Sequence, residues 1–334
     1  MSATRTRIAV DAMGGDFAPG NVITGALDAL RESGNRFELL LVGSEKIIAD
    51  ELNKAQHNGL ACSIVDAPEV VDMHDAATAV VREKKNSSIS VGMTLHKEGN
   101  ADAFVSAGHS GAMISASTLI LGRIEGVGRP TIGAFLPTER GVALLLDAGA
   151  NVDCKPQHLY EFAVMGSIYS AQMFNIPRPT VGLLSIGEES SKGNEAVKEA
   201  HKLLSDGKVN FIGNVEGRDI LPGKADVVVC DGFVGNIILK FAESVPSFLK
   251  SRLKQVVAKS ALGSVMGLMM RKTMRAALKS MDYEEYGGVP VLGVNGVSII
   301  GHGKSTPKAI KNMILKAEEV VKKNINHKIR EALS

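Results

Sequence analysis

The sequence has few of the residues on which several common protein functions depend. Its 334 residues include no tryptophan, four tyrosines and three cysteines, and its net charge is +2. So few aromatic rings and so little positive charge disfavour nucleic-acid binding. Cys62, Cys154 and Cys230 are odd in number and far apart, which argues against a disulfide framework or a cysteine metal site and fits a reducing cytoplasm.

Long apolar runs are also missing. No segment approaches the roughly 18 to 20 apolar residues that a membrane-spanning helix needs, and the chain begins without the apolar core of a signal peptide. We therefore expect neither export nor a transmembrane segment. The sequence has instead many short apolar runs that alternate with amphipathic stretches, which predicts a layered α/β fold.

The predicted sheet is at least partly parallel. Residues 39–42 and 227–229 are apolar throughout, as expected of strands that are covered on both faces. No repeat, low-complexity linker or shift in composition marks a domain boundary, so we expect one intertwined catalytic unit over residues 1–334. The last helical pattern, 306–332, follows Ser305 as its expected N-cap and should pack on the body.

A glycine-rich turn follows the first predicted strand. Residues 8–19 run from Ile-Ala-Val-Asp through Gly14 and Gly15 to a helical pattern that Pro19 opens. Glycine readily adopts positive φ and lets backbone N–H groups approach a ligand, while the N-terminus of a helix attracts anions. The turn, with Asp16 beside it, is therefore a candidate phosphate site. An ordinary βα turn is the alternative.

Three later segments share this organisation of strand, polar turn and helix: 103–112, 181–195 and 227–236. The turns that follow parallel strands lie along one edge of a sheet, where open α/β sheets bind their ligands. We therefore expect the four turns to converge on one site.

Three short motifs approximate known catalytic signatures without completing them. Residues 108–112 resemble the nucleophile elbow of serine hydrolases around Ser110, but alanine replaces the last glycine. Ser298 stands where a P-loop needs its first glycine. The first glycine-rich turn lacks the third glycine of the dinucleotide fingerprint. Serine hydrolysis, nucleotide hydrolysis and dinucleotide chemistry are therefore all disfavoured.

Taken in their order along the chain, many segments resemble the bacterial phosphate acyltransferases of phospholipid synthesis. The matching segments are 10–19, 82–88, 105–112, 146–153, 192–194, 214–219, 231–240 and 286–303. The resemblance covers nearly the whole chain. It implies a three-layer α/β/α sandwich around a large mixed, mostly parallel sheet, similar to the isocitrate/isopropylmalate dehydrogenase-like fold and to phosphotransacetylases. It also implies a homodimer.

The resemblance implies transfer of a long-chain fatty acyl group from acyl carrier protein to inorganic phosphate. The acyl phosphate would then pass to a membrane glycerol-3-phosphate acyltransferase. Because a thioester is already activated, the reaction needs positioning, charge neutralisation and an oxyanion site, and it requires no metal or other cofactor. Two alternatives remain open: a phosphotransacetylase that uses acyl-CoA, and a non-catalytic fatty-acyl carrier or scaffold.

Lys192 and Asn236 are the leading candidates for catalysis. Lys192 comes just before a predicted helix, where a lysine is unfavourable for the helix dipole unless an anion lies nearby; a solvated surface lysine is the alternative. Asn236 could donate to the oxyanion or cap a helix, and Asp11 and Asp231 could orient neighbours or act as caps. His302, between two glycines, could protonate the leaving thiolate. Besides His302, the expected phosphate- or substrate-binding residues are Gly14, Gly15, Asp16, Ser106, His109, Ser110, Gly193, Asn194, Asp231 and Gly235.

A basic segment, 244–281, is predicted to form a helical hairpin that projects from the body. It contains lysines and arginines but no acidic residue, and its middle part, 261–270, is uncharged and rich in methionine. Such a tip is too short to cross a bilayer but can enter the interface while basic side chains contact anionic headgroups. The expected membrane-contacting residues are Leu262, Val265, Met266, Leu268 and Met269. A methionine-packed dimer contact is the alternative, and the two can coexist. The prediction is a cytoplasmic protein that associates peripherally with the membrane.

Overall fold

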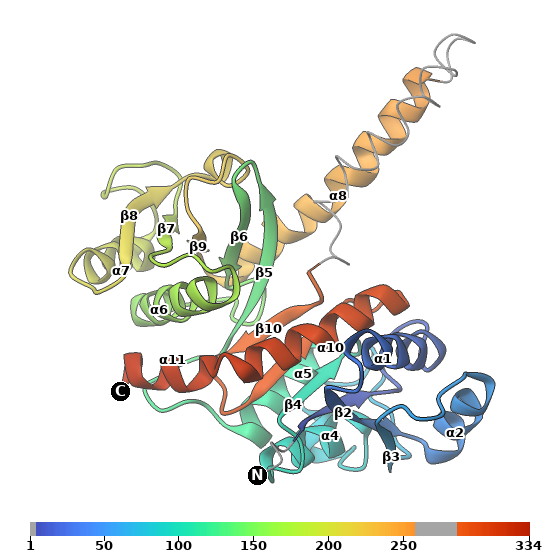
Figure 1. The fold of residues 1–334 in the computed structure, drawn as a ribbon. Helices are drawn as coiled ribbons and strands as arrows, with labels where there is room; N and C mark the ends of the chain where they lie inside the picture. The colour runs from blue at the N-terminus through green and yellow to red at the C-terminus, as the bar shows by residue number, and fades with distance from the viewer. Residues whose placement is uncertain (1–4, 258–285) are drawn as a thin grey trace.

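The computed structural model describes residues 5–257 and 286–334. Within these residues, eleven strands form one sheet in the order β3-β2-β1-β4-β11-β10-β5-β6-β9-β7-β8 (Figure 1). The strands are β1 (Thr6–Asp11), β2 (Phe37–Gly43), β3 (Cys62–Asp66), β4 (Ala103–Ser106), β5 (Thr131–Thr138), β6 (Gly141–Leu146), β7 (Thr180–Leu184), β8 (Asn210–Val215), β9 (Val227–Val229), β10 (Val289–Leu292) and β11 (Val297–Ile300). The predicted α/β class and large mixed, mostly parallel sheet are confirmed.

Helices cover both faces of this sheet. They are α1 (Gly20–Ser33), α2 (Glu45–Lys54), α3 (Ala79–Arg82), α4 (Ser88–Lys97), α5 (Ser110–Ala116), α6 (Pro156–Met173), α7 (Glu195–Ser205), α8 (Gly232–Val257), α10 (Pro307–Lys322) and α11 (Ile325–Leu333). Along β1, Ile8 and Val10 enter one hydrophobic core with α1, α6 and α10, whereas Ala9 enters a second core with α4 and α5. Residues 39–42 also contribute to both cores, as their continuous apolar run predicted.

The strands form two parallel groups that run in opposite directions. β1, β2, β3, β4 and β11 are parallel to one another, and so are β6, β7, β8 and β9. β10 is antiparallel to β11 and β5, and β5 is antiparallel to β6, so β10 and β5 join the groups. The C-terminal ends of the two groups therefore lie at opposite edges of the sheet. The turns after β1 and β4 leave from one edge and those after β7 and β9 from the other, so the four turns do not share an edge as expected.

The C-terminal helical pattern forms two helices rather than one. α10 begins after Thr306, whose hydroxyl, rather than that of Ser305, accepts the capping hydrogen bond from the helix. It ends before Asn324, whose φ of 51° interrupts the helical path, and α11 follows. The expectation of a single helix over 306–332 with Ser305 as its cap was therefore wrong.

α8 extends away from the rest of the structure (Figure 1). Its last part, residues 244–257, is the first part of the predicted hairpin segment, 244–281. The rest of that segment, with the expected membrane-contacting residues Leu262, Val265, Met266, Leu268 and Met269, lies outside the described residues. Among the helices that the structure describes, none is long and apolar enough to cross a membrane.

Candidate active site

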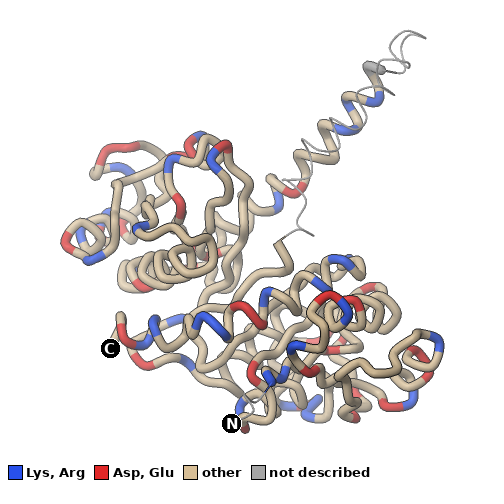
Figure 2. The backbone as a smooth tube through the Cα atoms, in the orientation of Figure 1, with Lys and Arg blue, Asp and Glu red and all other residues tan. Residues whose placement is uncertain are grey.

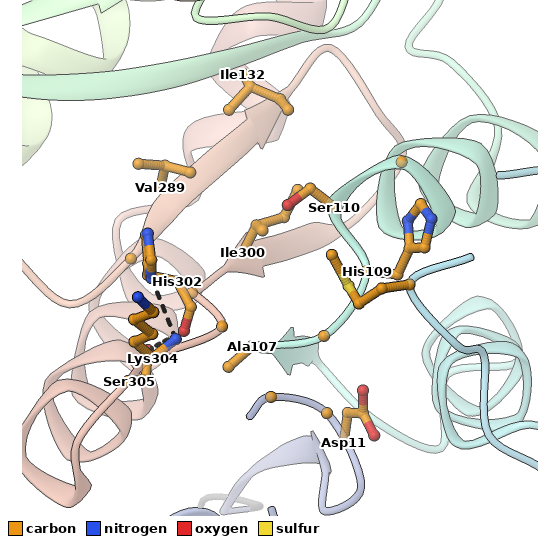
Figure 3. Close-up of a pocket in the computed structure, with 18 of the residues that line it drawn as sticks. Asp11, Ala107, His109, Ser110, Ile132, Val289, Ile300, His302, Lys304 and Ser305 are labelled. Atoms are coloured by element: carbon orange, nitrogen blue, oxygen red, sulfur yellow. Dashed lines mark hydrogen bonds between the residues drawn. The ribbon is translucent and has the colours of Figure 1, made fainter. Parts of the chain in front are cut away.

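A cavity of about 720 Å³ lies on the face of the sheet that α5 and α8 cover. The turns after β1, β4 and β11 line it with residues 13–16, 107–111 and 301–305, and the segment 70–73 contributes as well (Figure 3). Strands β5, β10 and β11 provide apolar side chains, and α8 provides a mixed polar and apolar face. The cavity therefore combines polar turns, which suit an anion, with apolar strands, which suit a hydrocarbon chain.

A buried aspartate supports the turn after β1. Asp11 is 1% exposed, and its carboxylate accepts hydrogen bonds from the Ser106 hydroxyl at 2.6 Å and from the Met13 amide at 3.1 Å. Burial raises the pKa of the Asp11 carboxyl above its ordinary value, and the hydrogen bonds that it accepts, including those from Ser88 and the Gly14 amide, oppose the rise only in part. Ser106 supports this network from outside the cavity lining. Ser88 was not singled out from the sequence, although it belongs to a segment that carried the resemblance.

The turns after β1, β4 and β11 are packed tightly against one another. A side chain at Gly14 would collide with the Asp11 carboxylate and the backbone of Gly108, so only glycine fits there. Gly15 has a φ of 113°, which side chains rarely tolerate. The amide of Asp16 donates a 2.7 Å hydrogen bond to the carbonyl of Gly303. Three turns from distant parts of the sequence thus form one wall of the cavity.

His109 and Ser110 lie at the start of α5. The Nδ1 atom of His109 accepts a hydrogen bond from the Ala112 amide at 3.1 Å, so His109 is the N-cap of α5 and its neutral ring carries the proton on Nε2. Within the described residues, the Ser110 hydroxyl has no hydrogen bond to a histidine. Both residues line the cavity, but they lack the geometry of a serine hydrolase.

His302 lines the cavity from the turn after β11. Its Nδ1 atom accepts a hydrogen bond from the Lys304 amide at 3.1 Å, and its carbonyl accepts one from the Ser305 hydroxyl at 2.6 Å (Figure 3). The neutral ring therefore carries its proton on Nε2. The contact with the Lys304 amide orients the imidazole, and the contact with the Ser305 hydroxyl holds the backbone of the turn.

A second buried aspartate, which sequence reasoning missed, supports the turn after β6. Asp147 is fully buried, and its carboxylate accepts hydrogen bonds from the amides of Ile132 at 3.0 Å and Asn151 at 2.6 Å and from the Asn151 side chain at 3.0 Å. The following residues, Ala148 and Gly149, line the cavity. The available signal was the Leu-Asp-Ala-Gly-Ala-Asn motif at 146–151, which carried the resemblance without pointing to a role.

Asn236 lines the cavity, and it does not cap a helix. α8 begins at Gly232, and Asp231 is its cap, because the Asp231 carboxylate accepts a 2.8 Å hydrogen bond from the Val234 amide. Asn236 therefore lies in the second turn of α8, packed beside Gly149. Gly235 and Asp231 do not line the cavity, but a side chain at Gly235 would collide with the Asp147 carbonyl, so this glycine allows α8 to approach the turn after β6.

Lys192 lies in the turn after β7, outside the cavity lining. Its side chain is exposed, and its amide donates to the Glu189 carbonyl at 3.0 Å. Asn194 is the N-cap of α7 and accepts a 2.9 Å hydrogen bond from the Val197 amide. Neither these residues nor Gly193 lines the cavity, so the structure does not bring the two leading catalytic candidates, Lys192 and Asn236, into one lining. Within the described residues, no group of histidine, cysteine, aspartate and glutamate has the arrangement of a metal site.

Comparison with known proteins places the chain in a family. A family profile described as a fatty acid synthesis protein matches residues 6–328. The phosphate acyltransferase of Chlorobaculum parvum is 48% identical over 98% of each chain, and that of Desulforamulus reducens is 50% identical over 98% of this chain and 97% of its own. The chain belongs to the phosphate acyltransferase family. It is therefore an enzyme that transfers an acyl group to phosphate, as the resemblance implied.

Solved structures support the same fold. The EutD phosphotransacetylase from Staphylococcus aureus superposes with a TM-score of 0.60 at 17% identity, over 95% of this chain and 94% of its own. A phosphotransacetylase from Streptococcus pyogenes also gives 0.60, at 19% identity, with the same coverage. At this level of identity the likeness concerns the fold alone.

Proposed function

We propose that this enzyme transfers a long-chain acyl group from the thioester of acyl carrier protein to inorganic phosphate, for phospholipid synthesis. The observation that carries the proposal is the composition of the cavity. Rigid glycine turns and a tautomer-fixed histidine lie at one part of its wall, and Ile132, Val289 and Ile300 lie at another. A volume of about 720 Å³ suits a ligand larger than an acetyl group.

The reaction uses no enzyme nucleophile. A phosphate oxygen attacks the thioester carbonyl carbon, a C–O bond forms, and the C–S bond breaks as the thiolate leaves with its electron pair and then takes up a proton. The oxyanion of the tetrahedral intermediate needs preorganised donors, a role we assign to the Asn236 amide. We assign protonation of the leaving thiolate to the His302 position in the cavity wall, with the proton coming from the attacking hydrogenphosphate. Lys192 is proposed as a cation that neutralises phosphate from the turn after β7.

Parallel assays test this function. The enzyme is supplied with palmitoyl thioesters of acyl carrier protein and of coenzyme A, each with and without phosphate, and acyl phosphate is measured. We expect acyl phosphate only when phosphate is present and the carrier thioester is the donor. Preference for the CoA thioester would identify an acyl-CoA phosphotransacylase instead, and no product from either donor would favour a carrier or scaffold. Equal thiol release without phosphate, abolished by Ser110→Ala, would favour a hydrolase.

We also propose that the enzyme is a homodimer. α8 carries a stripe of large apolar side chains, Phe233, Ile237, Phe241 and Phe248, which are 59%, 55%, 70% and 61% exposed. Their spacing places them along one side of the helix, and exposed apolar stripes of this kind favour helix-to-helix association. Phe248→Glu should convert the dimer to a monomer in analytical ultracentrifugation. A wild-type protein that sediments as a monomer would refute the proposal.

The proposed location is the cytoplasmic surface of anionic membranes. Basic residues recur along α8 (Figure 2), and exposed basic side chains near a bilayer attract anionic headgroups. An acyl phosphate is labile and amphipathic, so release at the membrane shortens its time in water. Leu268→Glu combined with Met269→Glu should abolish co-sedimentation with anionic liposomes and leave turnover in the soluble assay unchanged. Wild-type binding by this double variant, or its loss of the dimer, would rule out a membrane anchor there.

A further inference from the structure

One face of α8 presents a polar stripe to the cavity. Asn236, Lys240 and Glu243 all line it, and Leu239 lines it between them. Residues three and four apart share one side of a helix, so this spacing places the Lys240 side chain one turn along the same wall from Asn236. The helix thus brings an amide, an ammonium group and a carboxylate to one side of the cavity.

The charges around the cavity favour direct contact between phosphate and a cation. The charged lysine and carboxylate residues in the described lining are Asp11, Asp16, Asp72, Glu243, Lys240 and Lys304. Carboxylates outnumber ammonium groups in this lining, so direct contact with a lining ammonium group, in addition to the turn amides and the proposed contribution of Lys192, would offset the repulsion of a doubly charged phosphate. Lys240 extends from the same helical face as Asn236, the residue proposed to stabilise the oxyanion next to the attacking phosphate.

Lys240 is already paired, but only loosely. Its Nζ atom lies 2.9 Å from Oε2 of Glu243, and the two side chains are 59% and 33% exposed. Ion pairs with this exposure contribute little stability and are screened by salt. Phosphate carries more charge than one carboxylate and offers several acceptor oxygens. Phosphate can therefore replace Glu243 as the partner of Lys240 with little loss of free energy.

We propose that the Lys240 ammonium group binds the inorganic phosphate that attacks the thioester, and that Glu243 competes with phosphate for it. This inference rests on the proposed function. The carrier also has a phosphate, in the phosphodiester that links pantetheine to the protein. We assign Lys240 to the free phosphate because Lys240 lies on the same face of α8 as Asn236, to which we assign the oxyanion.

Steady-state kinetics of the full-length enzyme tests the assignment. Phosphate and palmitoyl carrier are varied separately for the wild type and for each variant. Lys240→Ala should raise the KM for phosphate by about 10- to 100-fold, as expected for one lost hydrogen bond to a charged group, and should leave the KM for the donor unchanged. Glu243→Gln should lower the KM for phosphate by about two- to fivefold, because it removes a weak competing ion pair. Lys46→Ala, which changes an exposed lysine of α2 outside the cavity lining, is the control and should leave both constants unchanged.

Each contrary result has a distinct meaning. An unchanged KM for phosphate in folded Lys240→Ala overturns the proposal, and so does an increase confined to the KM for the donor, which would assign Lys240 to the carrier phosphodiester. If Lys240→Ala fails to fold, Lys240→Gln, which keeps the length of the stem, is measured in the same way. If the wild type accepts only acyl-CoA, the carrier-based function fails, but the KM for phosphate with that donor still tests Lys240.

Discussion

The turn after β1 and the turn after β7 both connect a buried strand to a helix through polar residues and glycine, yet their surroundings differ. The first is packed between the turns after β4 and β11, with Asp11 buried beneath it and the Asp16 amide bonded to Gly303. The second is bonded to the end of β8, where the Ser185 amide donates to the Val215 carbonyl and the Asn214 side chain donates to the Glu189 carbonyl, and Lys192 is exposed. The difference shows that a turn becomes part of a cavity through its neighbours, which depend on the direction and order of the strands.

The largest expected effect is the loss of catalytic rate when Asn236, in the cavity lining, is changed. Asn236→Ala should lower kcat by about 10² to 10³, because it removes one preorganised donor to the oxyanion. The protein should remain folded, since Asp231 and not Asn236 caps α8. Steady-state or stopped-flow kinetics measures kcat, and thermal unfolding shows whether the variant is folded. Asn210→Ala, at the start of β8, removes a hydrogen bond to the Arg178 carbonyl and should keep the wild-type kcat.

The corresponding experiment on the turn after β7 is Lys192→Ala. We expect a loss of about 10² to 10³ in activity, because the variant lacks a cation proposed to neutralise phosphate. Lys192→Arg should restore little, since a planar guanidinium does not reproduce a compact ammonium group. A folded Lys192→Ala enzyme with wild-type turnover would refute the proposed role of Lys192 in catalysis. The catalytic residues would then all lie in the cavity lining.

A smaller effect is expected on the free energy of unfolding, which should fall more when a buried turn is changed than when an exposed turn is changed. Asp147→Ala leaves the buried amides of Ile132 and Asn151 without their partner and should lower the free energy of unfolding by about 3 to 5 kcal/mol. Asn194→Ala removes only an exposed helix cap and should lower it by about 1 kcal/mol. Urea unfolding gives both values. Equal losses would contradict the contrast between the two kinds of turn.

The smallest effect concerns pH. His96 holds the start of β11, because its Nε2 accepts from the Val297 amide at 2.7 Å while its Nδ1 lies 2.9 Å from the Ala101 carbonyl. Burial lowers the pKa of His96 below its ordinary value of 6.5. The unfolded chain therefore takes up the proton first, so this contribution to stability is complete above pH 6.5 and is lost as pH falls toward the folded pKa.

Melting temperatures measured from about pH 8 to about pH 5 test this expectation, since the range brackets the ordinary pKa of histidine. The wild type should lose stability more steeply over this range than His96→Gln, although the variant should be less stable at neutral pH because it loses a buried hydrogen bond. Parallel curves for the two proteins would show that other groups cause the acid sensitivity.

Local features of the fold were predictable from the sequence. Backbone preferences that act over a few residues predict the strand before Gly14, the glycine-rich turn and the helix that follows it. Local preferences did not decide which residue caps α10, because Ser305 and Thr306 are adjacent and both serine and threonine are favoured N-caps. They also did not predict the break at Asn324, because asparagine tolerates a positive φ without requiring it.

The candidate site was only partly predictable, because its assembly depends on long-range pairing. Three successive antiparallel pairings, of β11 with β10, of β10 with β5 and of β5 with β6, reverse the direction of half the sheet, and nothing in the sequence of these strands marks them as antiparallel. This reversal places the turn of Lys192 at the opposite edge from Gly14, and β6 and β9, whose following residues reach the cavity, lie between β7 and the first group of strands. Asp147 was missed although three of its four donors are local, from Ala150 and Asn151, because its burial and its fourth donor, the Ile132 amide, depend on the pairing of β5 with β6.

The position of β11 has a consequence for the synthesis of the protein. This strand lies between β4 and β10, near the middle of the sheet, although it comes after the other ten described strands in the sequence. A nascent chain that has not yet reached Ile300 therefore has two unpaired strand edges where the centre of the sheet should be, and open edges invite association with other chains. His302 and the rest of the turn 301–305, which line the cavity, follow β11 directly, so the central strand and this part of the cavity are synthesised together. Active enzyme can therefore form only after all eleven strands have been synthesised.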